Sequence, residues 1–391
     1  MTPAARVAAA IGLLDLALAG EPAEAALTRW ARASRYAGSG DRAAVRDLVY
    51  DSLRRLRSRT ALAGADRADG RALMIGALRE AGADPADVFT GAQNAPPPLT
   101  PSERDRPPRA PSRAEALDLP DWLVPALEAS LGDAFAPVAA ALRDRAPVVV
   151  RANAARLSRD EAQRDLAAEG IGSLPHPLVN FGLQLTGNAG KLRNSPVYLD
   201  GRVEVQDAGP QAACERLAAA LPPRARVLDY CAGGGGKALA LAALGLRVSA
   251  HDASPARMRD LPARAARAGV RVPVLDRAAA AAQAPWDAVV LDVPCSGSGT
   301  WRRTPETKWR LTAERVRELC AVQAGILEET QGLVGRGGVL CYMTCSLLGA
   351  ENGDTVRAFL SRHPGWTLAA EDRFTPLDGA DGFYAARLTR R

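Results

Sequence analysis

Short apolar runs that end in polar or glycine-rich turns dominate the second half of the chain. Ala288–Leu291 is such a run, followed at once by Asp292, and others begin at Val227, Val248 and Val339. β-Branched runs of this length, bounded by turn residues, are typical of buried strands. Because helical stretches separate them at the spacing of strand–helix–strand units, we predict an α/β fold with a doubly wound, mostly parallel sheet.

Three further apolar segments extend this prediction. Val272–Asp276 has the composition of a third strand, placed after those that begin at Val227 and Val248. Two last strands, near Trp366–Leu368 and Gly382–Leu388, are expected to close the sheet as a hairpin.

The first part of the chain has a helical period instead. Apolar residues recur three and four positions apart at Val45, Leu48, Val49, Leu53 and Leu56. The stretch Arg6–Gly20 is apolar but interrupted by a charge, so we interpret it as a domain helix and not a signal peptide. No stretch reaches membrane-spanning length without charges. We predict an all-helical domain over residues 1–145, with a proline-rich linker at about 92–111.

A small mixed module is predicted next. Pro147–Asn153 has the pattern of a strand, and Ser158–Glu169 that of a helix with a serine at its N-cap. Strand-like pieces follow to about Val205. We therefore expect an α+β module over residues 146–205 and the doubly wound domain over residues 206–391.

The composition narrows the possible partners. The 391-residue chain is 47% hydrophobic and carries a net charge of +6, which suits a polyanionic partner. Only three of its 50 cationic residues are lysines: Lys191, Lys237 and Lys308. Where arginine has replaced lysine almost everywhere, the remaining lysines are candidates for sites that need a compact ammonium. The six scattered cysteines indicate a reduced, cytoplasmic protein, and their spacing predicts no metal site.

A glycine-rich turn follows the strand that begins at Val227. Cys231-Ala-Gly-Gly-Gly-Gly-Lys237 lets the backbone turn sharply and approach a ligand closely. The next strand ends at Asp252, where a carboxylate can take the hydroxyls of a ribose, and the third ends at Asp276, which could accept from an adenine amino group. This order is the layout of an S-adenosylmethionine (SAM) site, and a dinucleotide site is the alternative.

Two thiols and an acid are expected to meet beside that turn. Asp292 and Cys295 follow one strand, and Cys345 ends another, so neighbouring strands would bring them together. A thiolate that adds to carbon 6 of cytosine makes carbon 5 nucleophilic enough to accept a methyl group. An acid at the N3/N4 edge of the base would stabilise the adduct. Spacing alone does not decide which of the two thiols attacks.

These residues carry a family resemblance. From about Pro147 onward the chain resembles the RNA (cytosine carbon-5) methyltransferases of the Sun and nucleolar-protein family, and most closely the bacterial members that act on 16S ribosomal RNA. The matching segments are Val148–Asn153, Val205–Asp207, Cys231–Lys237, Asp292–Gly299, Pro305–Trp309, Thr344–Ser346, Glu351–Asn352 and Asp381–Phe383. The resemblance implies a Rossmann-like SAM-dependent methyltransferase domain preceded by an RRM-like module. More weakly, the helical N-terminus resembles a NusB-like RNA-binding domain.

The resemblance also implies residue roles. Cys345 is the nucleophile, Cys295 assists turnover, Asp292 holds the base, and Lys308 contacts the base or a phosphate. SAM is held by Cys231, Ala232, Gly233, Gly234, Gly235, Gly236, Lys237, Asp252, Asp276 and Asp292. The partner is RNA, with no membrane, and the protein is expected to be a monomer in the cytoplasm. Gly234 and Ala238 depart from the family's usual Pro and Thr, which leaves the strength of SAM binding open.

Three alternatives remain at this stage. The substrate could be transfer RNA instead of ribosomal RNA. A non-catalytic RNA-binding factor for ribosome assembly is disfavoured because Cys345, Cys295, Asp292 and Lys237 are all present. A DNA cytosine methyltransferase would take its nucleophile from the Pro-Cys loop and leave Cys345 without a task.

Overall fold

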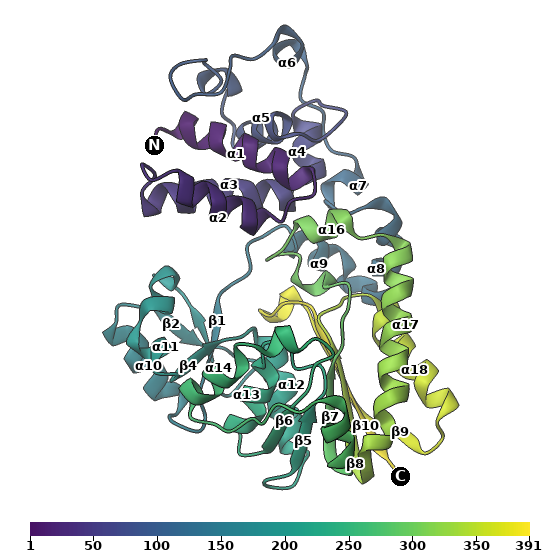
Figure 1. Cartoon of the computed structure of the whole chain (residues 1–391). Coiled ribbons are helices and arrows are strands. Elements are labelled where there is room, and N and C mark those ends of the chain that lie inside the picture. Colours follow the sequence, from purple (N-terminus) through teal and green to yellow (C-terminus); the bar gives the residue numbers. More distant parts are fainter. The chain divides into compact units, whose positions relative to one another are not determined.

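The computed structural model describes residues 1–391, which form two compact units (Figure 1). The first unit comprises Met1–Arg145 together with Thr300–Leu311. The second comprises Ala146–Gly299 and Thr312–Arg391. The short segment Thr300–Leu311 therefore lies within the sequence of the second unit but packs in the first, which no sequence pattern indicated.

The first unit is helical, as predicted. Its core is made by the apolar faces of the longer helices, where Leu14, Val45, Val49 and Leu73 are fully buried. The helices are α1 (Pro3–Leu18), α2 (Ala23–Ala33), α3 (Ser39–Arg54), α4 (Leu56–Leu62), α5 (Gly70–Glu80), α6 (Pro101–Asp105), α7 (Arg113–Ala116), α8 (Val124–Leu131), α9 (Phe135–Ala141) and α16 (Glu306–Arg310). The expected linker is partly ordered against this core, because Glu103 in α6 forms an ion pair with Arg71.

One run in this unit, Asp121–Ala141, is long and apolar enough to cross a membrane by length and composition. It is not one continuous helix. Gly132, with φ +54°, separates α8 from α9, and Glu128 and Asp133 lie within the run.

The second unit begins with a four-stranded antiparallel sheet in the order β2-β3-β1-β4. Its strands are β1 (Val149–Ala152), β2 (Ser173–Pro175), β3 (Gly182–Leu185) and β4 (Val203–Val205), and its helices are α10 (Arg159–Ala168) and α11 (Pro196–Leu199). Ser158 caps α10 through a reciprocal pair of hydrogen bonds with Glu161. The chain order βαββαβ is the one expected of an RRM-like module.

The rest of the second unit is the doubly wound sheet, in the order β6-β5-β7-β8-β10-β9. Its strands are β5 (Arg226–Asp229), β6 (Arg247–Ala250), β7 (Trp286–Asp292), β8 (Val334–Thr344), β9 (Trp366–Phe374) and β10 (Phe383–Arg390). β5 to β8 run parallel, and β9 and β10 form the predicted closing hairpin. The predicted strand at Val272–Asp276 is reduced to a single bridge between Ala250 and Val274. Pro273 has no N–H to continue the ladder, which accounts for the difference.

Helices cover both faces of this sheet (Figure 1). Alternate residues of each strand point to opposite faces. Val227 and Val290 pack with α12 (Ala208–Ala219), α13 (Gly236–Ala243) and α14 (Leu261–Ala268). Leu228 and Val289 pack on the other face with α15 (Arg277–Ala282), α17 (Ala313–Thr330) and α18 (Gly353–Arg362). Burial on both faces explains why the strands are continuous apolar runs.

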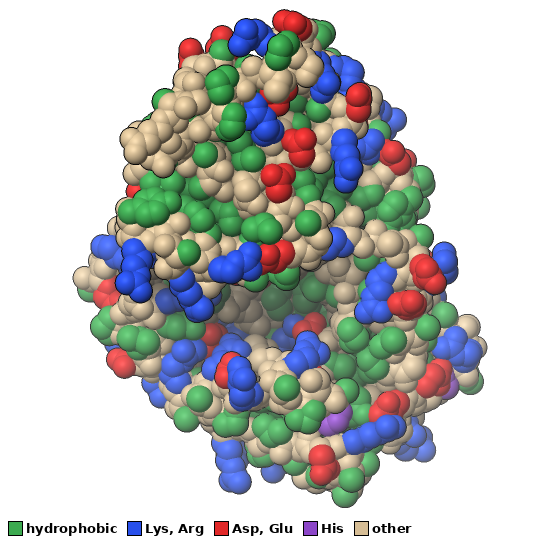
Figure 2. All heavy atoms as spheres, turned by 45° about the horizontal axis from the view of Figure 1, so that its top comes forward, with side chains coloured by type: hydrophobic (Ala, Val, Ile, Leu, Met, Phe, Trp, Pro, Cys, Tyr) green, Lys and Arg blue, Asp and Glu red, His purple; other side chains and the backbone are tan.

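Charged side chains are spread over the surface. Figure 2 shows that Lys and Arg side chains are interspersed with Asp and Glu side chains on the face in view. The net charge of +6 is therefore not gathered into one patch of a single sign on that face.

Candidate functional site

The predicted site residues gather where the strand order reverses. β5 lies between β6 and β7, so the loops after β5 and β7 leave the sheet in opposite directions and open a crevice. Open α/β sheets bind their ligands at this point. The glycine-rich turn follows β5, the Cys295 loop follows β7, and Cys345 directly follows β8.

The glycine-rich turn is held from the next strand. Gly233 (φ +51°) donates its backbone N–H to Asp252 Oδ2 at 2.8 Å, and Ser254 N–H donates to Oδ1 at 2.9 Å. Gly235 has φ +83° and precedes α13, and a Cβ there would lie 2.2 Å from Leu261 Cδ1. Only glycine fits that position without a shift. Asp252 is thus both the acid predicted for a ribose and the anchor of the turn.

A cavity of about 690 Å³ opens beside this turn. Three predicted residues line it: Cys231, Asp252 and Asp276. Sequence reasoning missed the rest of the wall, which includes Tyr230, Leu275, Pro294, Val322, Ile326 and Glu329. The apolar residues from α17 and the carboxylates opposite them suit a ligand that has a flat ring and a hydroxyl-bearing sugar. Asp276 Oδ1 also caps α15 by accepting from Ala279 N–H at 2.7 Å.

A second cavity, of about 550 Å³, lies at the amino ends of β5 to β7. It is lined by Arg224, Arg226, Arg247 and Arg271, and it contains none of the predicted site residues. The crevice at the carboxyl ends is therefore where the candidate chemistry resides.

Asp229 is a site residue that sequence reasoning missed. It ends β5 directly below the turn, is 1% exposed, and has no hydrogen-bond partner for either carboxylate oxygen. Burial raises its pKa to about 7, although the nearby Lys237 ammonium opposes that change. An unpartnered buried carboxylate is costly unless a ligand satisfies it. Such a carboxylate fits the positively charged groups of SAM. The feature of the sequence that could have revealed it is an acid placed directly before a glycine-rich turn.

Lys237 and Asp292 form an ion pair across the crevice. The Lys237 ammonium donates to Asp292 Oδ2 at 2.5 Å and lies 5.3 Å from the centre of the Phe383 ring. Burial would lower the pKa of Lys237, but the Asp292 carboxylate outweighs it and the pKa is raised. The ammonium therefore stays charged and fixes the position of Asp292.

The two thiols are in direct contact. Cys295 Sγ and Cys345 Sγ are 3.4 Å apart and both cysteines are free. A hydrogen bond from the Cys295 thiol lowers the pKa of Cys345 against the effect of burial. The same contact raises the pKa of Cys295. The sulfur–sulfur distance is the same for both thiols, so it is the direction of the two pKa shifts that favours Cys345 as the thiolate of the pair.

Glu351 holds the two thiol-bearing loops together. This residue is fully buried, and its Oε1 accepts from Ser296 N–H at 2.7 Å and from Gln323 Nε2 at 3.1 Å. Its Oε2 accepts from the hydroxyls of Ser296 and Ser346, each at 2.5 Å. Because Ser296 follows Cys295 and Ser346 follows Cys345, one carboxylate sets the spacing of both sulfur atoms.

Lys308 is buried within the first unit. It lies in α16 and is 1% exposed. Its ammonium donates to the Arg54 carbonyl at 3.4 Å and lies 4.5 Å from the centre of the Trp309 ring. Burial lowers the pKa of Lys308 to about 7; Asp118 opposes this shift, whereas Arg143 and Arg54 add to it.

Lys308→Met is expected to stabilise the protein, most strongly at low pH. The folded protein binds this proton only below about pH 7, whereas the unfolded chain binds it below its ordinary pKa of 10.5. The free energy of unfolding therefore falls as the pH falls from 10.5 to about 7, and the full cost of burying the charged ammonium is present below about pH 7. Melting temperatures of the variant and the wild type should differ most near about pH 6 and converge towards about pH 10. Lys191→Met, at an exposed lysine, is the control. A difference that is independent of pH would contradict the burial of a charge.

Two family models match the chain. The model described as 16S rRNA methyltransferase RsmB/F matches residues 218–389, and an RsmF/B-like ferredoxin-like domain matches residues 119–190. Ribosomal RNA small subunit methyltransferase B of Xanthomonas campestris pv. campestris is 34% identical over 301 residues, which are 72% of this chain and 68% of that protein.

Two solved structures share the fold. The crystal structure of PH0851 matches with a TM-score of 0.76 at 23% identity and covers 100% of this chain and 99% of its own. NSun6 from Pyrococcus horikoshii, crystallised with SFG, matches with a TM-score of 0.60 at 18% identity over 69% of this chain and 98% of its own. At these identities the likeness extends to the fold alone.

Proposed function

Because this chain belongs to the RsmB/F family of 16S rRNA methyltransferases, we propose that it transfers a methyl group from SAM to carbon 5 of a cytosine in 16S ribosomal RNA. We take it to act as a monomer in the cytoplasm. The observation that carries the proposal is the pair of thiols, Cys295 and Cys345, 3.4 Å apart beside the Lys237–Asp292 ion pair. A thiol that can act as a nucleophile beside an acid suits covalent catalysis at carbon 6 of a cytosine.

The proposed steps use this chain's own groups. The Cys345 thiolate adds to carbon 6 of the cytosine, and Asp292 hydrogen-bonds the N3/N4 edge, so electron density moves to carbon 5. Carbon 5 takes the methyl group and then gives its proton to Cys295, which acts as the base. The electron pair of that C–H bond re-forms the ring double bond, and Cys345 leaves carbon 6 as the thiolate. Cys295 is in contact with Cys345. Lys237 keeps Asp292 in place throughout.

The residues around the cavity fit SAM, which would supply an electrophilic methyl group. Asp252 would take the ribose hydroxyls, Asp276 the adenine amino group, and the turn Cys231–Lys237 the methionine part. Asp229 offers an unpartnered carboxylate below that turn. Each of these assignments pairs a carboxylate or backbone group with a ligand atom of complementary charge.

Incubation with labelled SAM tests the proposal. Transfer to 16S ribosomal RNA, with bisulfite sequencing that locates one protected cytosine, is the expected result. Label in transfer RNA alone would show that the substrate is transfer RNA and not ribosomal RNA. The absence of label in any RNA would overturn the proposed activity.

Asp252→Ala supplies the matched test of the cofactor site. Loss of a hydrogen bond to a charged group should weaken SAM binding by about 2 kcal/mol, measured by calorimetry. Asp252→Asn keeps an acceptor for Gly233 N–H and separates the loss of the ribose contact from a loosened turn. Unchanged affinity in both variants would remove Asp252 from the site.

A further inference from the structure

A group of arginines surrounds the second cavity, at the amino ends of β5 to β7. This cavity has a volume of about 550 Å³, which lies within the usual range for pockets that hold small ligands. No Asp or Glu lines it, whereas four arginines do: Arg224, Arg226, Arg247 and Arg271. All of them belong to the second unit. We refer to this hollow as the arginine cavity.

Two of these arginines are held by neutral backbone groups. Arg226 donates to two backbone carbonyls just before β7, at 3.0 and 2.7 Å, and its guanidinium lies 4.7 Å from the centre of the Trp286 ring. Its backbone N–H donates to Asp287 Oδ2 at 2.7 Å, but Asp287 does not line the cavity. Arg247 Nε–H donates to the Arg224 carbonyl at 2.9 Å. Because a carbonyl orients a guanidinium without cancelling its charge, both groups keep a full positive charge in fixed positions.

The other two side chains can meet a ligand directly. Arg224 and Arg271 are exposed, and neither side chain forms a hydrogen bond or an ion pair with another residue. Arg156, from the RRM-like module, adds a further guanidinium at the edge of the cavity. It donates to the Asp200 carbonyl and lies against Gly269, which lines the cavity, so that a Cβ on Gly269 would be 2.7 Å from Arg156 Nη2. The wall therefore presents both fixed and adaptable cationic groups.

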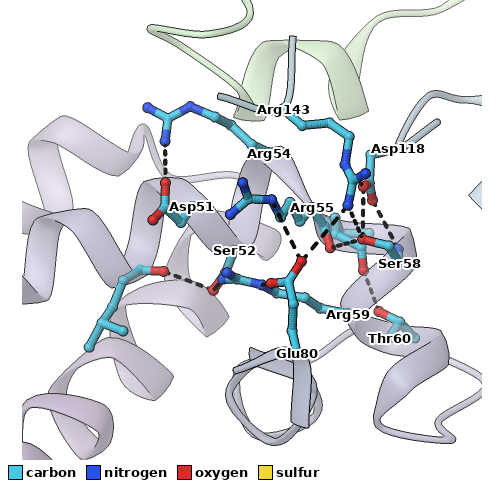
Figure 3. Close-up of polar contacts among 12 residues, drawn as sticks. Asp51, Ser52, Arg54, Arg55, Ser58, Arg59, Thr60, Glu80, Asp118 and Arg143 are labelled. Carbon is cyan, nitrogen blue, oxygen red and sulfur yellow. Dashed lines mark hydrogen bonds and ion pairs between the residues drawn. The ribbon is translucent and has the colours of Figure 1, made fainter. Parts of the chain in front are cut away.

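Arginines that gather in the helical unit are neutralised by acids, in contrast to those of the arginine cavity. Arg59 forms an ion pair with Glu80 at 2.9 Å (Figure 3). Arg143 forms one with the fully buried Asp118, also at 2.9 Å. None of the four arginines that line the cavity forms an ion pair. Like charges gathered around one hollow repel one another, and an anion that binds there removes the repulsion.

The chemistry of this wall suits the phosphates of a nucleic acid strand. A guanidinium presents paired N–H donors that match two phosphate oxygens. Several separate guanidinium groups suit a polymer with a repeated anionic group better than a ligand with a single charge. The lining also includes the apolar residues Leu246, Val248 and Val270, against which a ribose or a base can pack.

The arginine cavity is well separated from the thiol site within the same unit. β7 begins at Trp286, which lines the cavity, and ends at Asp292, beside the thiols. At a rise of about 3.3 Å per residue, these two ends lie about 20 Å apart. A ligand in the arginine cavity therefore does not compete with SAM or with the target base, and it can belong to a distant part of the same RNA.

We propose that the arginine cavity is a second RNA-binding site, which takes phosphate groups of the substrate RNA at a distance from the cytosine that is methylated. The identity of the RNA rests on the proposed function. The inference goes beyond that function because it places a contact with the RNA at the edge of the sheet opposite the catalytic residues.

The test is the binding of 16S ribosomal RNA to the full chain, measured without SAM over a range of salt concentrations. Arg224→Gln and Arg271→Gln combined remove two positive charges but no side-chain bond within the protein, so the melting temperature should not change. The affinity should fall by about tenfold at low salt. The slope of log affinity against log salt should become shallower by about 1.5, because two phosphate contacts no longer release counterions. Arg224→Lys combined with Arg271→Lys keeps both charges and should restore the slope.

Arg317→Gln is the control for the loss of an exposed arginine. Arg317 lies in α17 of the same unit, forms no ion pair and does not line the cavity. This variant should keep the affinity and the slope of the wild type. An unchanged slope in the double Gln variant would overturn the proposal. So would an equal loss of affinity per removed charge in Arg317→Gln, because that result shows a general electrostatic effect. Since binding is measured without methyl transfer, failure of the proposed activity would leave this result readable.

Discussion

Cys345→Ala should abolish methyl transfer and leave SAM binding intact. In the proposed mechanism only Cys345 adds to carbon 6, and burial still keeps the pKa of the Cys295 thiol above its ordinary value once the Cys345 contact is removed. Where catalytic residues work together, as Cys345 and Cys295 are proposed to do, loss of the nucleophile removes nearly the whole rate enhancement. Single-turnover transfer to 16S ribosomal RNA, together with calorimetry of SAM binding, measures both parts of this expectation.

Cys295→Ala should behave differently from Cys345→Ala. The Cys345 thiolate still attacks and the methyl group is transferred, but release slows because the neighbour 3.4 Å away is gone. A protein–RNA complex that survives denaturant should therefore accumulate on a gel. The double variant should show no complex, since the covalent bond runs through Cys345. A trapped complex with Cys345→Ala and none with Cys295→Ala would reverse the two roles and favour the logic of DNA cytosine methyltransferases.

Glu351→Ala should have the second-largest effect. It removes an acceptor from Ser296 N–H, both serine hydroxyls and Gln323, and leaves these buried donors unsatisfied. The two sulfur atoms lose their common spacer, so transfer should fall by about 100-fold, while the cavity for SAM is unchanged. The melting temperature should also fall, because each unsatisfied buried donor costs on the order of 1–3 kcal/mol.

Glu215→Ala is the control for a lost carboxylate acceptor. Glu215 accepts backbone N–H groups of Asn180 and Phe181 in the RRM-like module, away from the thiols. It should lower stability without changing the single-turnover rate per folded molecule. If Glu351→Ala likewise lowers stability without changing the single-turnover rate per folded molecule, Glu351 has no part in positioning the thiols.

The sheet was predictable because its strands obey a local rule. Apolar runs that begin at Val227, Ala288 and Val339 predicted buried strands with polar or thiol residues at their carboxyl ends, whereas the order of the strands comes from the structure. The strand predicted at Val272–Asp276 is the exception. Pro273 has no backbone N–H to donate, and this outweighs a composition that favours a strand.

Contacts between distant segments were beyond sequence reasoning. The hydrogen bonds from Ser296 to Glu351 span 55 positions, and no periodicity encodes them. Lys308 shows the opposite problem. The scarcity of lysine suggested a site for it, whereas the structure buries its ammonium inside the helical unit. A rare residue type can be kept for its packing as well as for a role in a functional site, and only its three-dimensional environment distinguishes the two.

The placement of Thr300–Leu311 has a consequence for biosynthesis. The bond from Trp309 to the Leu53 carbonyl joins residues 256 positions apart, so the ribosome completes most of the chain before the first unit can receive its last element. Until then, the ends of α1, α2 and α3 lack the partners they have in the finished protein. Closing so long a loop is slow and comes late in folding. We expect the nascent helical unit to be protease-sensitive at these helix ends and to become resistant only after residue 311 has emerged.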